Sequence, residues 1–289
     1  MCCILKMAAK ILENEKISRR TALAGLAGVL FGNSFVFGQE ESDKTRQKQD
    51  NLEDYVGESI KDYASIATLD SLKTIGYQGG YFDSKEANCW RLETTFIPFY
   101  FDENLGENRI VIPSEEIIER ALTNQVNKNF VDYLENLKEK GFNLSYSKPV
   151  SEVTLGEKKV DFTINLPIVL RKQRTVNGKE SYIDERVDLK NHKVSHDFPL
   201  LDSLEIARYV VESRDKNPEV ICISELTDLV REKDLHVGLY GYDKIKDFEG
   251  ELIQITESKK EMENVKIYLQ FLNKFKRKKN LAPTKLPGY

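Results

Sequence analysis

The chain has 289 residues, of which 40% are hydrophobic and 31% are charged, and its formal net charge at pH 7 is −4. This length can bury the core of one large domain or of two small ones. The acidic balance argues against nucleic acid as the main partner, because neutralising phosphates requires a basic surface. We therefore expect a folded protein that binds no nucleic acid specifically.

Residues 1–38 have the pattern of an export signal. Basic residues precede an uncharged run of 18 residues from Thr21 to Gly38, and a charged polar stretch follows. Arg19 and Arg20 resemble the pair of a twin-arginine signal, which exports proteins that are already folded. The alternatives are a signal cleaved after Gly38, an uncleaved membrane anchor at the lower limit of length for a span, and a buried internal helix. We predict an exported protein, extracellular or on the outer face of the cytoplasmic membrane.

A polar segment and a helix follow the signal. Residues 39–51 have no apolar periodicity, which predicts a flexible linker. From Leu52 onward, apolar residues recur at spacings of three and four, which predicts a helix that continues to about Ile75. Gly76 is the expected left-handed cap at its end, because glycine adopts that backbone conformation without a steric cost.

The stretch "IGYQGGYF" (75–82) places glycines among aromatic residues. A phosphate-binding loop needs a preceding strand and a following helix, whereas here a helix precedes and a strand is predicted to follow. We expect a tight turn that packs its aromatics over the first helix. Alternatively, nearby aromatics form a platform that stacks on sugar rings. The candidate binding residues of that platform are Tyr77, Tyr81, Trp90 and Tyr100.

The remaining pattern predicts helices packed on antiparallel sheet. Ser114 is a good N-cap for a long amphipathic helix that ends at Gly141, with Glu115 and Glu116 in its first turn. Alternating apolar residues, with turn signals at Gly156-Glu157 and Asn177-Gly178, then predict an antiparallel meander with one solvent-exposed face. The fold class is therefore α+β, with a helical section at 52–141 and a β-rich section at 142–273.

Histidine and cysteine give two candidate sites. His192 and His196 have the HxxxH spacing of a metal-binding pair, but their flanks predict strand and loop, and hydrogen-bonded histidines are the alternative. Cys89 and Cys222 can form a disulfide in an exported chain, or remain two buried thiols. The sequence has no CxxC pair, so we expect neither a cysteine zinc site nor a thioredoxin-type redox site.

The sequence contains no GxSxG elbow, and it indicates no cofactor. Its many acidic residues leave open a carboxylate pair of the glycosidase type. We favour a non-enzymatic binding or structural role in the cell envelope. The alternatives are a secreted hydrolase acting on glycan or peptide, and a solute-binding protein.

The segment Lys274–Lys279 carries five basic residues in six and opens a basic tail at 274–289. Positive charge of this density attracts anionic surfaces, such as lipid headgroups or acidic polymers. The alternative is a solvated tail without a partner. We expect the partner to be an envelope protein or a surface polymer.

Four segments together resemble a family of uncharacterised exported or membrane-anchored archaeal proteins that carry a QGGY motif. The resemblance spans roughly residues 52–272. It implies an envelope location and no catalytic residues, since no activity is known for that family. The segments are "IGYQGGYF" (75–82), "IPFYF" (97–101), "IPSEEIIERAL" (112–122) and "VDFTINLPIVLRK" (160–172).

Overall fold

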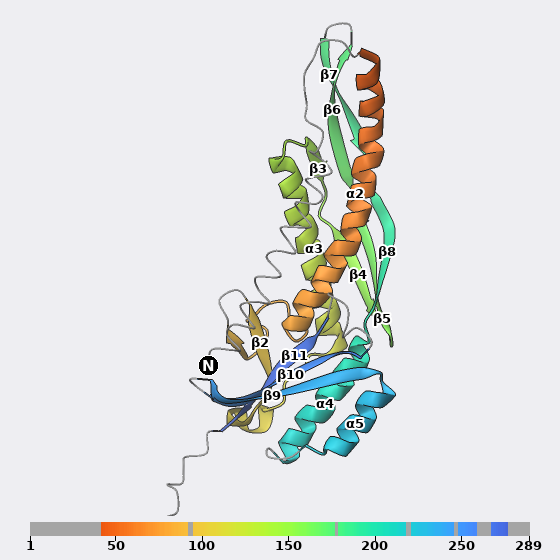
Figure 1. Ribbon diagram of the computed structural model, residues 1–289. Coiled ribbons are helices and arrows are strands. Elements are labelled where there is room, and N and C mark those ends of the chain that lie inside the picture. The colour runs from red at the N-terminus through yellow and green to blue at the C-terminus, as the bar shows by residue number, and fades with distance from the viewer. Residues whose placement is uncertain are drawn as a thin grey trace, which may run out of the picture. The chain divides into compact units, whose positions relative to one another are not determined.

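The computed structural model divides the chain into two compact units, Met1–Asn51 and Leu52–Tyr289. In the part of the chain that it describes, four α-helices and eleven strands in mixed and antiparallel sheets confirm the α+β class (Figure 1). The predicted signal, with Arg19 and Arg20, lies outside the described residues. The described residues are 42–91, 95–176, 179–217, 221–245, 248–258 and 267–276.

Helix α2 (Ser42–Tyr77) opens the described chain. Most of segment 39–51, predicted to be a flexible linker, is therefore helical. The physical reason is that residues 42–51 contain neither glycine nor proline and are rich in lysine, arginine and glutamine, which favour helices even without an apolar stripe. Further along, the predicted apolar stripe is confirmed, because Val56, Ile60 and Ala67 are buried and Tyr63 is half-buried.

Helix α2 ends in the predicted tight turn, but the capping glycine is not the expected one. Gly79 has a φ of 53°, its N–H donates to the carbonyl of Gly76 (3.1 Å), and the N–H of Gly80 donates to the carbonyl of Ile75 (2.8 Å). This is the paired hydrogen bonding of a Schellman cap. Gly76 is helical and serves a close approach instead, because a Cβ there would lie 2.1 Å from the carbonyl oxygen of Tyr268.

A five-stranded mixed sheet follows the turn. Strands β2 and β11 are parallel, and the other neighbours are antiparallel. Pro98 lies inside β2, opposite Cys89 of the three-residue strand β1. The order is β1 (Cys89–Arg91), β2 (Phe96–Asp102), β11 (Leu269–Phe275), β10 (Phe248–Glu257) and β9 (Leu235–Ile245).

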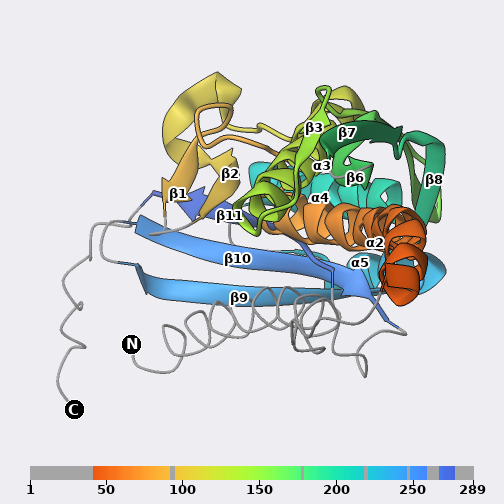
Figure 2. The same cartoon turned by 90° about the horizontal axis from the view of Figure 1, so that it is seen from above.

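Two helices accompany this sheet. Helix α4 (Leu200–Lys216) contacts β2, β10 and β11, so it lies along one face of the sheet (Figure 2). Helix α5 (Ile223–Glu232) contacts α4 and β9. The 3-10 helix η1 (Glu103–Asn108) extends β2, and the chain then returns beside β2, with Phe101 bridged to Ile110.

The predicted antiparallel meander is confirmed. Strand β5 leads directly into β6 past Pro167, and β7 leads into β8, so the chain passes twice between the two three-stranded sheets β4-β5-β8 and β3-β6-β7. Along β5, residues from Val160 to Leu166 alternate between buried and half-buried, which gives the sheet one covered face. The bounds are β3 (Leu144–Tyr146), β4 (Val150–Leu155), β5 (Lys159–Leu166), β6 (Ile168–Val176), β7 (Lys179–Arg186) and β8 (Leu189–Asp197).

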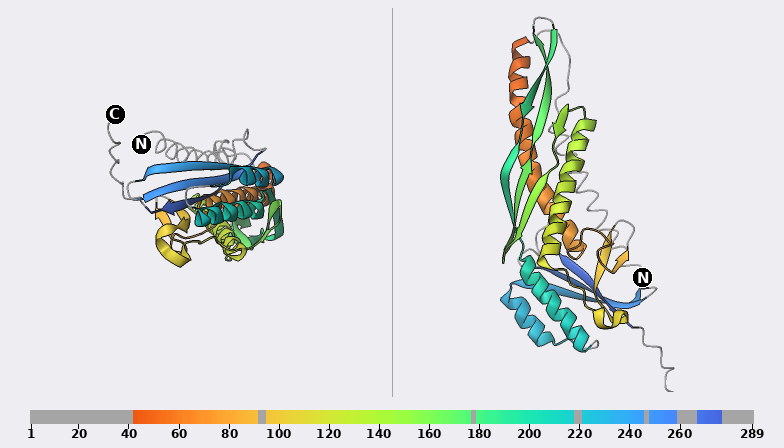
Figure 3. Two further views of the ribbon diagram at one scale, coloured as in Figure 1. Left: turned by 90° about the horizontal axis from the view of Figure 1, so that it is seen from below. Right: turned by 180° about the vertical axis from the view of Figure 1, so that it is seen from behind.

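Helix α3 (Glu115–Glu139) joins the layers of the core. It contacts β4, as Figure 3 also shows, and it packs on α2 through Tyr63, whose ring stacks on Tyr133 at 3.8 Å between centroids. Asn129 of α3 donates to the carbonyl of Ala67 (3.1 Å), which satisfies a polar group between the two helices. One continuous hydrophobic cluster runs through these helices and both sheet systems.

The two glycines inside α2 make a matched test of the close approach at its end. Gly76→Ala should destabilise the protein by about 2–4 kcal/mol, because a Cβ would collide with backbone at Tyr268. Gly57→Ala should be neutral or stabilising by up to about 1 kcal/mol, since its Cβ would meet Val187 at an ordinary 3.4 Å and alanine favours helix. Urea unfolding of both variants measures the difference. Equal effects of the two substitutions would contradict the close approach.

Candidate functional site

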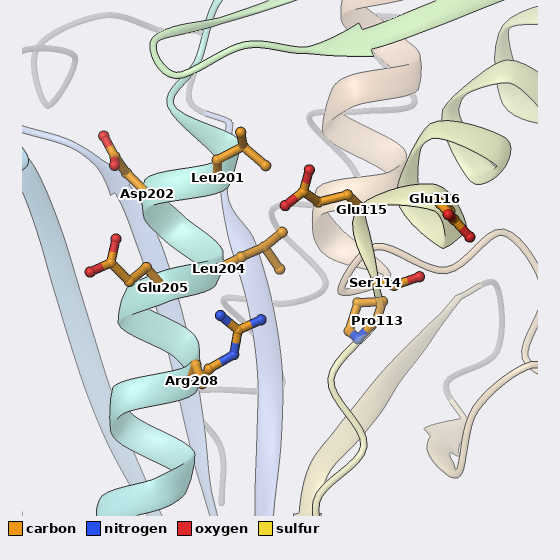
Figure 4. A pocket seen from close by; sticks show the side chains of 9 residues that line it. All are labelled: Pro113, Ser114, Glu115, Glu116, Leu201, Asp202, Leu204, Glu205 and Arg208. Atoms are coloured by element: carbon orange, nitrogen blue, oxygen red, sulfur yellow. The ribbon is translucent and has the colours of Figure 1, made fainter.

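A groove lies between the start of helix α3 and helix α4 (Figure 4). Its volume is about 680 Å³, which is within the range of ligand sites. Most of the lining residues belong to helices α3 and α4, and Pro113 and the N-cap Ser114 directly precede α3, so the side chains are held on a rigid frame. The lining residues are Pro113, Ser114, Glu115, Glu116, Leu201, Asp202, Leu204, Glu205 and Arg208.

The α3 wall depends on the helix cap and on the glycine turn behind it. The Ser114 hydroxyl accepts from the N–H of Ile117 (3.4 Å), as an N-cap should. Behind this turn, the backbone of Gly80 lies so close that a Cβ there would come within 2.8 Å of Ile118 and 3.0 Å of Pro113. The turn that ends α2 therefore fixes the position of the groove wall.

The α4 wall supplies the apolar part of the groove. Leu204 is buried and Leu201 is half-buried, and in Figure 4 both project toward the α3 wall. The Arg208 side chain projects the same way from the next turn, and the Glu115 carboxylate points toward Leu201 from the opposite wall. Apolar groups thus lie between a carboxylate near Leu201 and a guanidinium near Pro113.

Four carboxylates line the groove against one guanidinium. Asp202 accepts hydrogen bonds from Lys233 (2.8 Å) and Lys158 (3.0 Å), and Lys233 also pairs with Glu205 (2.7 Å). Burial by itself raises the pKa of Asp202, but the hydrogen bonds from the two lysines outweigh it, and the pKa is lowered. Asp202 is therefore held as a fixed negative charge at neutral pH.

The four predicted aromatic binding residues do not form a platform. Tyr81 and Tyr100 are 2% and 0% exposed, so the prediction that they stack on sugar rings is wrong. The Tyr100 hydroxyl donates to the carbonyl of Gly79 (2.7 Å), and burial raises the pKa of Tyr81 to about 12. Tyr77 and Trp90 are half-buried, with Tyr77 against Tyr268 and Trp90 in β1. The alternative expectation, aromatics packed at a tight turn, is confirmed for Tyr81 and Tyr100.

The structure does not assemble the predicted metal site. His192 and His196 lie on strand β8, where residues four apart are separated by about 13 Å rather than by one helical turn. The Nε2 atom of His196 is 2.8 Å from the Thr68 hydroxyl of α2. Among the described residues, no group of three or more histidine, cysteine, aspartate or glutamate side chains could hold a metal ion.

The predicted disulfide is also absent from the described part of the chain, because both of its cysteines are free thiols. Cys89 is half-buried, with its sulfur 3.6 Å from the carbonyl of Ser84. Cys222 is exposed at the start of α5, with its sulfur 3.3 Å from the Ser224 hydroxyl. The expectation of two buried thiols is therefore wrong for Cys222.

The predicted basic tail begins later than expected. Lys274 belongs to strand β11, and its ammonium pairs with Asp102 (3.2 Å), which is almost fully buried. Lys276 is exposed, and the rest of the segment up to Lys279 lies outside the described residues. The charge of Lys274 is thus already neutralised within the fold.

Sequence reasoning did not find the groove. It identified Glu115 and Glu116 only as the acidic first turn of a helix, and it assigned no role to Leu201, Leu204 or Arg208. The two walls are more than 80 residues apart in the chain, and no spacing rule connects them. Only the packing of α4 beside the start of α3 brings them together.

Comparison with protein-family models, with curated proteins and with solved structures found no match for this chain. The resemblance to archaeal envelope proteins therefore stays a prediction. Within the ranges that the structure describes, no helix has both the length and the apolar character needed to span a membrane.

The burial of His192 generates a prediction about pH. Burial, followed by the charge of Lys61, lowers its pKa below the usual 6.5. Above about pH 6.5 the histidine is neutral in the folded and the unfolded chain, and its contribution to stability is fully present. As the pH falls below this value, the unfolded chain binds the proton before the folded chain does, so the free energy of unfolding decreases. We expect the free energy of unfolding to fall from pH 7.5 to pH 5.5, and less steeply in His192→Gln. The exposed His236, as His236→Gln, is the control. An unchanged slope in His192→Gln would refute the assignment.

Proposed function

We propose that the chain is an exported, non-enzymatic binding protein of the cell envelope. Its binding site is the groove between α3 and α4, and its ligand is an extended cationic segment of a partner protein that carries apolar side chains. The observation that carries this proposal is that the half-buried Leu201 lies in one groove with the exposed carboxylates of Glu115 and Glu116.

The groove offers a partner two kinds of interaction. Leu201, which is half-buried, provides most of the leucine surface, because Leu204 is only 5% exposed, and each Å² of such surface removed from water is worth about 25 cal/mol. Glu115 and Glu116 are exposed at the first turn of α3, where a lysine or arginine of a partner can reach them. Charge complementarity of this kind raises the association rate and selects against acidic partners.

The location outside the cell is part of the proposal and rests on the sequence. The uncharged run from Thr21 to Gly38, with Arg19 and Arg20 in front of it, has the pattern of an export signal. A binding protein of the envelope would meet partner proteins and surface polymers at this location.

The carboxylates of the groove suit binding better than hydrolysis. A glycosidase needs one carboxyl group with a raised pKa as its acid and a second that stays ionised. In the groove, the pKa of Asp202 is lowered by its two lysines, and Glu205 is engaged with Lys233. Asp202 therefore stays ionised and supplies no proton, and the carboxylates that remain to attract a cation are the exposed Glu115 and Glu116.

Binding of a defined peptide tests the proposal. The probe is a fluorescent ten-residue peptide of alternating lysine and leucine, and its affinity is measured by fluorescence anisotropy. The variant E115K/E116K should bind at least about tenfold more weakly, because it reverses two charges at the groove. The control E225K/D228K makes the same change of charge on α5, where both carboxylates are exposed, and should bind as the unmodified protein does.

Three outcomes decide the proposal. Loss of binding in the groove variant alone supports it. Equal loss in both variants would show attraction by overall charge and would contradict a specific site. A peptide with glutamate in place of lysine should bind far more weakly, and equal binding of the two peptides would also contradict the proposal.

A further inference from the structure

We propose that residues 277–289 of this chain occupy the groove of the same molecule, so that a partner segment must displace them. The inference rests on the proposed function, because it proposes that a segment of the same chain competes with the partner segment for the groove. Three observations support it: the place where this tail leaves the fold, the distance it must cover, and its chemistry.

The start of the tail is fixed beside the end of helix α4. The N–H of Lys276 donates to the Glu103 carboxylate (2.7 Å), and Lys274 pairs with Asp102. The guanidinium of Arg214, in the last turn of α4, lies 5.6 Å above the ring centre of Phe275. The tail therefore emerges next to one end of the helix that forms a wall of the groove.

The groove is within reach of the tail. Arg208, at the near end of the groove, precedes Arg214 by six residues of α4, which is about 9 Å of helical rise. The thirteen residues 277–289 span up to about 40 Å when extended. Because the tail is tethered, its effective concentration at the groove is on the order of millimolar, so a weak contact suffices for occupancy.

The tail has the chemistry that the groove selects. It contains no acidic residue, and it carries apolar side chains between its basic ones. Four extended residues, 277–280, are long enough to cover the distance of about 9 Å along α4, so Leu281 is the first apolar side chain able to contact Leu201. Lys285, further along the tail, is then available to pair with Glu115 of the opposite wall. The basic residues of the tail are Arg277, Lys278, Lys279 and Lys285.

Photo-crosslinking in the full chain tests the occupancy. A benzophenone amino acid replaces Glu116 at the rim of the groove, and Asp228 on α5 is the control position; both are exposed. Illumination followed by peptide mapping should give crosslinks from position 116 to residues 277–289 within one chain. Position 228 should give at least tenfold less. Adding the substitutions L281D and K285E to the position 116 protein should abolish the crosslink.

The two proposals fail differently. In the full chain, L281D/K285E should bind the lysine–leucine peptide at least fivefold more tightly than the unmodified protein, because the competitor has been removed. If peptide binding is unchanged and position 116 gives no crosslink to the tail, the tail inference is overturned while the binding groove stands. If neither protein binds the peptide, the proposed function itself fails. Crosslinks between two chains would show that the tail of one molecule binds the groove of another, and would also overturn the inference.

Discussion

The buried turn at Gly76–Gly80 is the contact on which the rest of this structure depends. At Gly76 the backbone of α2 meets the carbonyl of Tyr268, at the entrance of strand β11, with no room for a Cβ. The carbonyl of Gly79 accepts from the Tyr100 hydroxyl of β2, and the side-chain amide of Gln270 on β11 donates to the carbonyl of Tyr77 (2.9 Å). A single turn thus fixes the helix to two central strands. A buried backbone carbonyl without such a donor would cost roughly 1–3 kcal/mol.

The same turn connects the fold to the groove. Gly80 packs against Pro113 and Ile118, which form and support the α3 wall. The opposite wall is part of α4, which lies on the sheet that contains β2 and β11. Both walls are therefore positioned by elements that meet at the turn. This arrangement holds Leu204 and Glu115 on rigid helices on either side of an open groove, as the proposed binding of an extended segment requires.

Local signals in the sequence predicted the elements and much of their packing, but not the site. The cap at Ser114 and the alternation from Val160 to Leu166 are short-range patterns, and the structure confirms both. Segment 39–51 was misjudged because helix propensity without an apolar stripe carries no periodic signal. Gly76 was expected to be the cap because its close approach depends on Tyr268, nearly 200 residues away. The groove and the buried state of Tyr100 follow from the same kind of long-range packing, which no pattern within one segment encodes.

Native-state hydrogen exchange tests the central role of the turn most directly. The Gly80 amide, which bonds to the carbonyl of Ile75, should exchange only with the global unfolding of the unit, at the same free energy of opening as amides of β11 and of α3 near Ile118. Coincident opening of these three regions in low denaturant would show that the turn, the sheet and the groove wall form one cooperative unit. Opening of Gly80 at a clearly lower free energy than β11 would contradict this account.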